Sequence, residues 1–197
     1  MSAGDLVNVL GRTLGLSLAA GINLYATVAI LGLVTRFGWV DLPAQYRVFG
    51  NPWIIGAALS LYAVEFVADK IPWVDSLWDA VHTVIRPIGG ALIAVASIGP
   101  SQPVFQAMAA IAGALVATST HAAKAGTRAV ANTSPEPFSN WALSLAEDGF
   151  VITLGLLALT HSLAAAIVVV VALAAIIIAF RWLIRRLRSF RNRSYPN

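Results

Sequence analysis

Residues 65–90 read EFVADKIPWVDSLWDAVHTVIRPIGG and carry seven titratable side chains inside an otherwise apolar chain. Tryptophan, valine, leucine and isoleucine take one face of the helix that this stretch predicts. On a wheel at about 100° per residue, four titratable residues fall within about 60° on the other face: Asp75, Asp79, His82 and Arg86. Because charge is costly in a bilayer, this stripe must face protein, a water-filled cavity or the membrane interface.

Composition places the stretch in a membrane protein. The chain has 197 residues, of which 58% are hydrophobic and 11% charged, and its mean hydropathy is +0.78. A soluble domain carries about 25% charged residues. One span needs roughly 20 apolar residues, so the sequence predicts an all-α, polytopic membrane helix bundle of about six spans. The chain has no cysteine, which excludes disulfides and thiolate metal sites.

Six apolar segments are the expected spans, at about residues 13–35, 53–70, 75–98, 104–130, 138–160 and 162–180. We expect the third span to run through Pro87 with a kink, and a break at that proline is the alternative. We expect the fifth span to be interrupted at Glu147-Asp148-Gly149. The boundary at Thr160-His161 is poorly marked, so the number of spans there stays open.

The basic residues predict how the chain is oriented. Six of the thirteen Lys and Arg residues lie between Arg181 and Arg193. The positive-inside rule places this end in the cytoplasm, and six spans would place the N-terminus there too. We therefore expect one transmembrane domain over residues 1–184 and a basic cytoplasmic tail over residues 185–197, in a cytoplasmic (inner) membrane. The tail indicates topology and contact with membrane lipids, and no nucleic-acid partner is expected.

A short internal repeat is visible. The string ALSL at residues 58–61, followed by Phe66-Val67, recurs at residues 142–145 with Phe150-Val151 at the same spacing. If the first three spans repeat as the last three, the two units have opposite topology, as in many transporters with kinked or broken helices. Chance similarity in apolar sequence is the alternative.

A second polar stripe, His121, Lys124 and Arg128, follows the spacing i, i+3, i+7 in the fourth span. Burying one ion without its partner is costly, so we expect the two stripes to pair with acids of neighbouring spans. The expected pairs are Arg86 with Glu65 or Glu147, and Lys124 with Asp79.

This mixture of acids, histidines and bases predicts a transporter or translocator of an anionic solute or lipid head group, with a proton carried by an acid or a histidine. The alternative is a non-catalytic scaffold or assembly partner, and a homo-oligomer is compatible with either. Asn23 is either an interhelical hydrogen-bond donor or a ligand contact. The candidate substrate-binding or proton-coupling residues are Asn23, Glu65, Asp69, Asp75, Asp79, His82, Arg86, His121, Lys124, Arg128, Glu147 and Asp148.

An enzyme is the weaker hypothesis. Asp75, Asp79 and His82 have the residue types of a metal site. The sequence has no metalloprotease motif, P-loop or nucleophile elbow. We therefore assign no catalytic residue, metal ligand or cofactor.

Three strings carry a resemblance to a known family: GINLYATVAILGL at residues 21–33, VEFVADKIPWVDSLWDAVHTVIRP at residues 64–87, and NTSPEPFSNWALSLAED at residues 132–148. They resemble a family of small bacterial multi-pass membrane proteins known only as a domain of unknown function. The resemblance covers most of the chain up to Asp148. It implies a bacterial membrane protein and brings no activity with it.

Overall fold

The computed structural model describes residues 3–133 and 138–194, and over these residues it is helical with no strand. The expected all-α fold is confirmed. The elements are α1 (Ala3–Ile22), α2 (Leu24–Phe37), the 3-10 helix η1 (Ala44–Gly50), α3 (Pro52–Ala68), α4 (Pro72–Ile98), α5 (Pro103–Ala131), α6 (Phe138–Thr160) and α7 (Ser162–Ser194).

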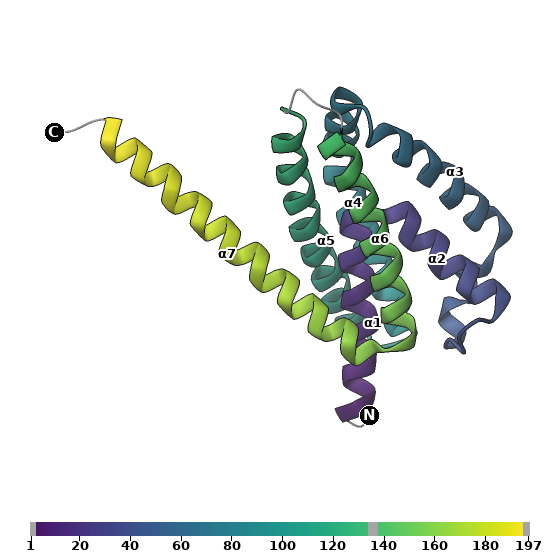
Figure 1. Cartoon of the computed structure of the whole chain (residues 1–197). Coiled ribbons are helices and arrows are strands. Elements are labelled where there is room, and N and C mark those ends of the chain that lie inside the picture. Colours follow the sequence, from purple (N-terminus) through teal and green to yellow (C-terminus); the bar gives the residue numbers. More distant parts are fainter. Residues whose placement is uncertain (1–2, 134–137, 195–197) are drawn as a thin grey trace.

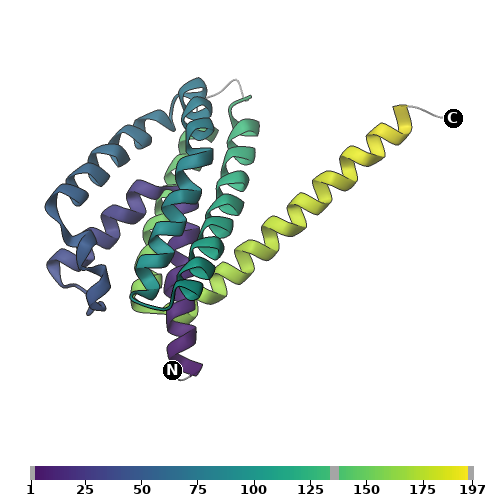
Figure 2. The same ribbon diagram turned by 180° about the vertical axis from the view of Figure 1, so that it is seen from behind.

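Helix α1 lies at the centre of the bundle and contacts α4, α5, α6 and α7. Helices α2 and α3 lean against one side, and α7 crosses the base of the bundle and then diverges from it (Figures 1 and 2). Helix α1 begins at the end of the bundle opposite to that reached by the far end of α7 (Figure 1). Six complete spans would have brought both ends of the chain to the same end of the bundle.

The physical reason is a break in the first expected span. Asn23 has extended backbone angles, φ −145° and ψ 100°, and separates α1 from α2. Its side chain caps α2 by accepting a hydrogen bond from the backbone N–H of Ala26, 2.9 Å away. Asparagine is among the best N-cap residues, so the chain can turn here inside an apolar segment. Helix α1 therefore ends within the bundle, against Ala117 and Thr120 in the middle of α5.

The apolar helices indicate an integral membrane protein. In the described part of the chain, four are long and apolar enough to cross a bilayer: α4, α5, α6 and residues Ser162–Arg186 of α7. Helices η1 and α3, bent by 61°, make a fifth span if they are counted together. The count of four to five is close to the expected six, and it is lower because Asn23 divides the first expected span.

The sequence predicted that one helix continues through Pro87 and that another is interrupted at residues 147–149, and only the first prediction holds. Helix α4 runs unbroken with Pro87 inside it, as expected. Helix α6 also runs unbroken through residues 147–149, so the interruption expected there was wrong. Cations on α5 and Asn23, between α1 and α2, partner the acids of this segment, and the helix does not need to open to solvate them. The boundary between α6 and α7 falls at His161, as expected.

Small residues let the helices approach closely at the centre. A Cβ added to Gly113 would lie 2.5 Å from the carbonyl oxygen of Gly90, which shows how near the α4 and α5 backbones come. The Ser17 hydroxyl of α1 donates to the same carbonyl oxygen at 3.2 Å. Contacts between small residues are the usual way for membrane helices to gain packing energy.

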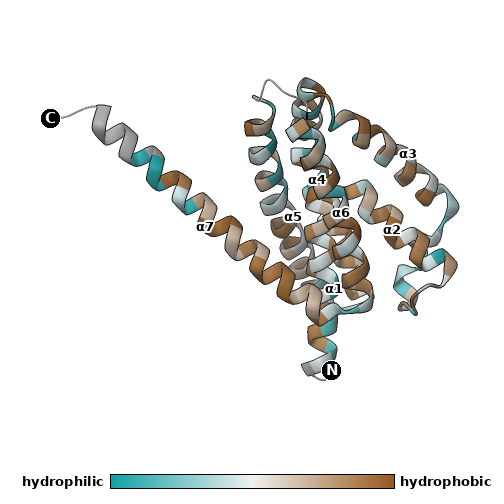
Figure 3. Ribbon diagram, in the orientation of Figure 1, coloured by the Kyte–Doolittle hydropathy of each residue, from teal (hydrophilic) through white to brown (hydrophobic). Residues whose placement is uncertain are grey.

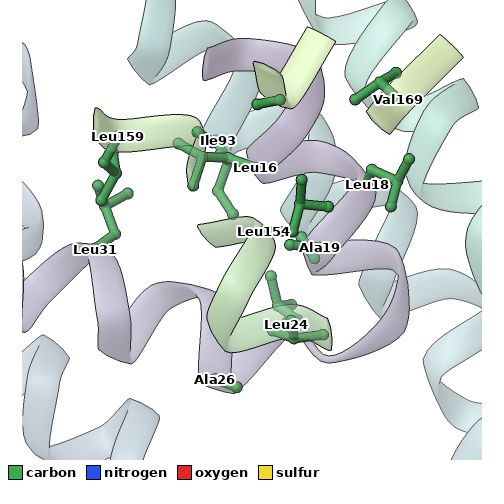
Figure 4. Close-up of a cluster of buried hydrophobic side chains, with 14 of the residues drawn as sticks. Leu16, Leu18, Ala19, Leu24, Ala26, Leu31, Ile93, Leu154, Leu159 and Val169 are labelled. Atoms are coloured by element: carbon green, nitrogen blue, oxygen red, sulfur yellow. The ribbon is translucent and has the colours of Figure 1, made fainter. Parts of the chain in front are cut away.

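Below this crossing, large aliphatic side chains fill the core; Figure 4 shows Leu16, Ile93, Leu154 and Leu159 among them. Apolar residues also cover the outward faces, most plainly along α3 and the first part of α7 (Figure 3). Trp53 is 86% exposed and Val67 is 58% exposed on α3. An outward-facing apolar surface of this kind suits lipid contact.

Candidate functional site

The twelve candidate residues lie at one end of the bundle, where α3 and α5 end and α4 and α6 begin; we call them the charged cluster. Glu147 is the partly exposed member, and the other eleven are at most 6% exposed. The cluster reaches down to the end of α1 inside the bundle. By the rise of 1.5 Å per residue, Arg86 lies about 20 Å from the start of α4.

Arg86 is the deepest cation of the charged cluster and is fully buried. Its guanidinium donates to Glu65 at 2.6 Å and to Asp79 at 3.2 Å. It also donates to His121 Nδ1 at 2.7 Å, and at 3.5 Å to the backbone oxygen of Gly21 near the C-terminus of α1. A cation is favoured at a helix C-terminus, so the broken end of α1 contributes to holding Arg86. The expected pairing with Glu65 is present.

Two cations of α5 form a second layer nearer the end of the bundle. Lys124 Nζ lies 3.1 Å from Asp69, 3.4 Å from Glu65 and 3.7 Å from Glu147. The expected partner Asp79 is instead paired with Arg86. The sequence could not decide this, because α4 and α3 each present acids towards α5.

Arg128 holds α3, α5 and α6 together. Its guanidinium donates to Glu147 at 2.6 Å and to Asp69 at 3.1 Å. It also donates to the side-chain oxygen of Asn140 at 2.8 Å and to the backbone oxygen of Asp69 at 2.8 Å. Charged groups that share several hydrogen bonds in this way make the strongest contacts in a protein interior.

Two acids of the charged cluster have no cation. Within the described residues, neither Asp75 nor Asp148 forms an ion pair. Asp75 accepts from the side-chain amide of Asn132 at 2.7 Å, and Asp148 accepts from that of Asn23 at 3.2 Å. One oxygen of each carboxylate is buried without a hydrogen-bond partner, as is one oxygen of Glu65, Asp69 and Asp79, and the Tyr62 side chain also interacts with Asp148. Asn23 thus has the interhelical hydrogen-bonding role considered from the sequence, and it also caps α2, a role that was not predicted from the sequence.

The two histidines hold opposite tautomers. His82 Nδ1 lies 2.7 Å from the Trp78 carbonyl oxygen, which can only accept, so this nitrogen carries the proton. Its Nε2 then accepts from the Tyr25 hydroxyl at 3.0 Å. His121 Nδ1 faces Arg86, which can only donate, so the proton of a neutral ring lies on Nε2 and is donated to Thr83 at 3.1 Å.

The charge balance of the cluster is acidic. It contains six carboxylates, and its cations are Arg86, Lys124 and Arg128 with Lys70 at its edge. With both histidines neutral, the acids exceed the cations by two. The excess belongs to the cluster as a whole, because Lys70 forms no ion pair among the described residues and its charge acts on both Asp148 and Asp69.

Two cavities reach the cluster from different faces of α5. One, of about 230 Å³, lies between α1, α5, α6 and α7 and meets Lys124 and Glu147. The other, of about 240 Å³, lies between α4 and α5 and meets Asp79 and Arg128. Glu147 lines the first cavity and its ion-pair partner Arg128 lines the second.

Several polar residues of the site were not among the candidates: Tyr25, Lys70, Asn132 and Asn140. Lys70, in the turn between α3 and α4, donates to the Phe66 carbonyl oxygen at 2.8 Å and to Ser144 at 3.3 Å. Burial lowers the pKa of its ammonium group, and the nearby Asp148 and Asp69 oppose this effect. The sequence signal for all four was weak: a polar residue at the edge of an apolar segment.

The three residues of α4 with side chains of the types that bind metals each contact a different partner. Asp75 binds Asn132, Asp79 binds Arg86, and His82 binds Trp78 and Tyr25. Over residues 3–133 and 138–194, no group of three or more His, Asp or Glu side chains is arranged to hold a metal ion.

Comparison with known proteins gives one match. A family model described as "Domain of unknown function (DUF4126)" matches residues 10–182. No curated protein and no solved structure matches the chain. The matched range contains every residue of the charged cluster.

Proposed function

Because the chain belongs to the family described as Domain of unknown function (DUF4126), which brings no activity with it, we propose a function from the geometry of the charged cluster. The protein is a small membrane transporter or translocator in which buried carboxylates carry a proton coupled to movement of a solute or lipid head group. Its proposed location is the cytoplasmic membrane of a bacterium.

The observation that carries the proposal is the pair of acids without cations, Asp75 and Asp148. A buried charge without a partner is strongly unfavourable, so each acid is expected to hold a proton or to meet a passing cation. Groups that fix helix packing alone would be matched in charge. Buried carboxylates without an ion-pair partner are the feature that packing does not require.

The two cavities support a pathway. They approach the Arg128–Glu147 ion pair from two faces of α5, one at Glu147 and the other at Arg128. A centre that is reached from two sides and closed between them suits alternating access, in which one side opens as the other closes. The exchange of salt-bridge partners would provide the two states.

The cluster also bears on the choice of transported group. The cations that could hold an anion are already paired, since Arg86, Lys124 and Arg128 each contact two or more carboxylates. An anion would therefore have to displace a carboxylate. Protonation of an acid would release its cation, which couples anion binding to proton uptake.

The proposed inverted repeat has limited support from the arrangement. Helices α3 and α6, which carry the repeated ALSL strings, run in opposite directions along the bundle (Figure 1). Their acids Glu65 and Glu147 both contact Lys124. Opposite direction and a shared centre are properties of inverted repeats.

A scaffold role is the second candidate, and the seven ion pairs favour it. Buried ion pairs can specify one arrangement of helices even where they add little stability. Under this role the cluster would carry no flux, and variants at the two acids without cations would behave like the parent protein.

Reconstitution into liposomes with an enclosed pH-sensitive dye separates the two roles. We expect proton movement driven by an imposed gradient of the transported anion or lipid. The variants Asp148→Asn and Asp75→Asn, which keep the shape of the side chain and remove the titrating group, should each lower this flux at least tenfold.

Asp41→Asn is the matched control, because Asp41 is exposed and lies outside the cluster. It should leave the flux unchanged. If both cluster variants transported as well as the parent, or if no gradient produced flux from folded protein, the scaffold role would be the better account.

A further inference from the structure

The cavity of about 230 Å³ has walls of two kinds. Apolar side chains make up most of its lining, including Leu18 of α1, Leu143 and Phe150 of α6 and Ile176 of α7. The polar lining is confined to α5 and to one position of α6, where Lys124 and Glu147 lie among threonines. A site with an apolar body and one charged end is shaped for an amphiphile rather than for a small ion.

The cavity opens sideways, towards the bilayer. Helix α7 packs on α1 at its base and diverges from α5 and α6 further along (Figures 1 and 2). The cavity lies in the resulting wedge, since Ala172 and Ile176 in the middle of α7 line it. Phe150, at its edge, is 38% exposed in the apolar outer surface. A molecule dissolved in the membrane can therefore reach the cavity without crossing the aqueous phase.

The depth of the charged end suits a lipid head group in the course of crossing the bilayer. Lys124 lies about 10 Å from the end of α5, and Glu147 about 14 Å from the start of α6, at 1.5 Å per residue. Lipid head groups lie at the ends of the spans, outside a hydrocarbon core about 30 Å thick. The site thus lies between the interface and the bilayer centre.

Charge selects the kind of head group. Glu147 has the most accessible side chain of the ion-paired residues, at 12%, whereas that of Lys124 is 2% exposed. Lys124 is already shared by Glu65, Asp69 and Glu147. The group that meets an incoming ligand is therefore the Glu147 carboxylate, which Arg128 holds at 2.6 Å and Lys124 at 3.7 Å, so an incoming ammonium group has to exchange for one of these cations. An ammonium group is attracted to that position, and a head group with only negative charge is not.

We infer that this lateral cavity binds the head group of a membrane phospholipid that carries a primary amine, with the amine against Glu147 and the acyl chains in the bilayer. The volume agrees, because 230 Å³ is below the roughly 300–1,000 Å³ of sites that enclose a drug-sized ligand. It holds a head group and leaves the chains outside. The inference rests on the proposed function in one respect: it makes this lipid the translocated substrate.

The test is lipid retention by purified protein in detergent, measured by native mass spectrometry. The probes are an ethanolamine phospholipid, a glycerol phospholipid with the same acyl chains, and water-soluble phosphoethanolamine. We expect one ethanolamine lipid per chain, retained at least tenfold more strongly than the glycerol lipid. Phosphoethanolamine should not bind, because it lacks the chains that bring it to the opening.

A filling substitution shows whether this cavity holds the lipid. Ala123→Phe places an aromatic ring inside the cavity, whereas Ala122→Phe places the same ring on the exposed neighbouring position of α5. We expect Ala123→Phe to lower retention at least tenfold and Ala122→Phe to leave it unchanged. Circular dichroism of both variants confirms that they are folded.

Three results would overturn the inference: equal retention of both lipids, binding of phosphoethanolamine as tight as that of the lipid, or retention unaffected by Ala123→Phe. Failure of the proposed function gives a different result. In that case the ethanolamine lipid would still bind selectively to the parent and to Asp148→Asn, and liposomes would show neither proton flux nor lipid movement.

Discussion

The two halves of the bundle are built on different physical principles, although α4, α5 and α6 run through both. Above the end of α1, these helices face one another with Arg86, Lys124, Arg128 and the acids that partner them. Below it, the same helices meet through Gly90 and Gly113 and through aliphatic side chains. The boundary between the halves is the level at which α1 stops.

The difference separates the contacts that stabilise the bundle from the charged residues, which must be retained for another reason. Close contact of small residues is favourable in a membrane without any charged group. Buried ion pairs regain roughly what they lose on desolvation, and replacement by apolar residues often leaves stability unchanged or raises it. The apolar half therefore accounts for how the bundle holds together. The charged half is retained for a task, or for specifying the arrangement of its helices.

The largest expected effect is in the charged half. Arg86→Met leaves Asp79 buried without its ion-pair partner, and we expect it to lower the free energy of unfolding by about 3–5 kcal/mol. Denaturant titration in detergent micelles measures this change. Combining Arg86→Met with Asp79→Asn removes the unpaired charge and should recover part of the lost free energy of unfolding.

Arg36→Met, at an exposed arginine, is the control and should change the free energy of unfolding little. A similar loss at both arginines would contradict the role assigned to burial of Arg86.

In the apolar half, a larger side chain should disrupt the close approach of α4 and α5. Gly113→Leu places a side chain against the α4 backbone at Gly90, and overpacking of this kind costs about 1–3 kcal/mol. Gly126→Leu on the same helix is the control, because a Cβ there meets no atom within 4 Å. The same micelle titration compares the two. Equal stability of the two variants would show that the helices do not cross as closely as described.

The boundary between the halves depends on Asn23. Asn23→Ala removes the cap of α2 and the donor to Asp148, so we expect a loss of about 1–2 kcal/mol. Asn51→Ala is a comparison cap, since Asn51 accepts from the Trp53 N–H at the exposed start of α3. It should cost less, because no buried carboxylate loses a partner. Thermal melting by circular dichroism ranks the two variants, and the reverse order would argue against a structural role for the Asn23–Asp148 contact.

The smallest expected effect on stability is at Asp148 itself. In Asp148→Asn an amide oxygen can still accept from Asn23, and no ion pair is lost, so unfolding should change by less than about 1 kcal/mol. Stability and flux would then be separable at this position. A loss as large as that of Arg86→Met would mean that Asp148 is held as a charged structural partner, and it would weaken the transport proposal.

Much of the site was accessible from the sequence because helical periodicity is local. Asp75, Asp79, His82 and Arg86 share one face wherever that helix lies, so their burial together could be predicted. The break at Asn23 could have been suspected, since a strong N-cap residue stands inside an apolar run. Its neighbours nevertheless predicted one continuous span, because no local rule says whether an asparagine will cap a helix or face another one.

The sequence by itself determined the class of protein, the helices and the two titratable stripes, since composition and spacing along one helix depend on nearby residues alone. The tertiary structure decided the partners. Lys124 could have paired with any acid of α3, α4 or α6, and Coulomb attraction does not distinguish them until the helices are placed. Only that placement left Asp75 and Asp148 without cations and opened a cavity beside Glu147. The excess of acidic groups and the cavity that reaches them depend on distances between helices. No sequence pattern within one helix specifies those distances.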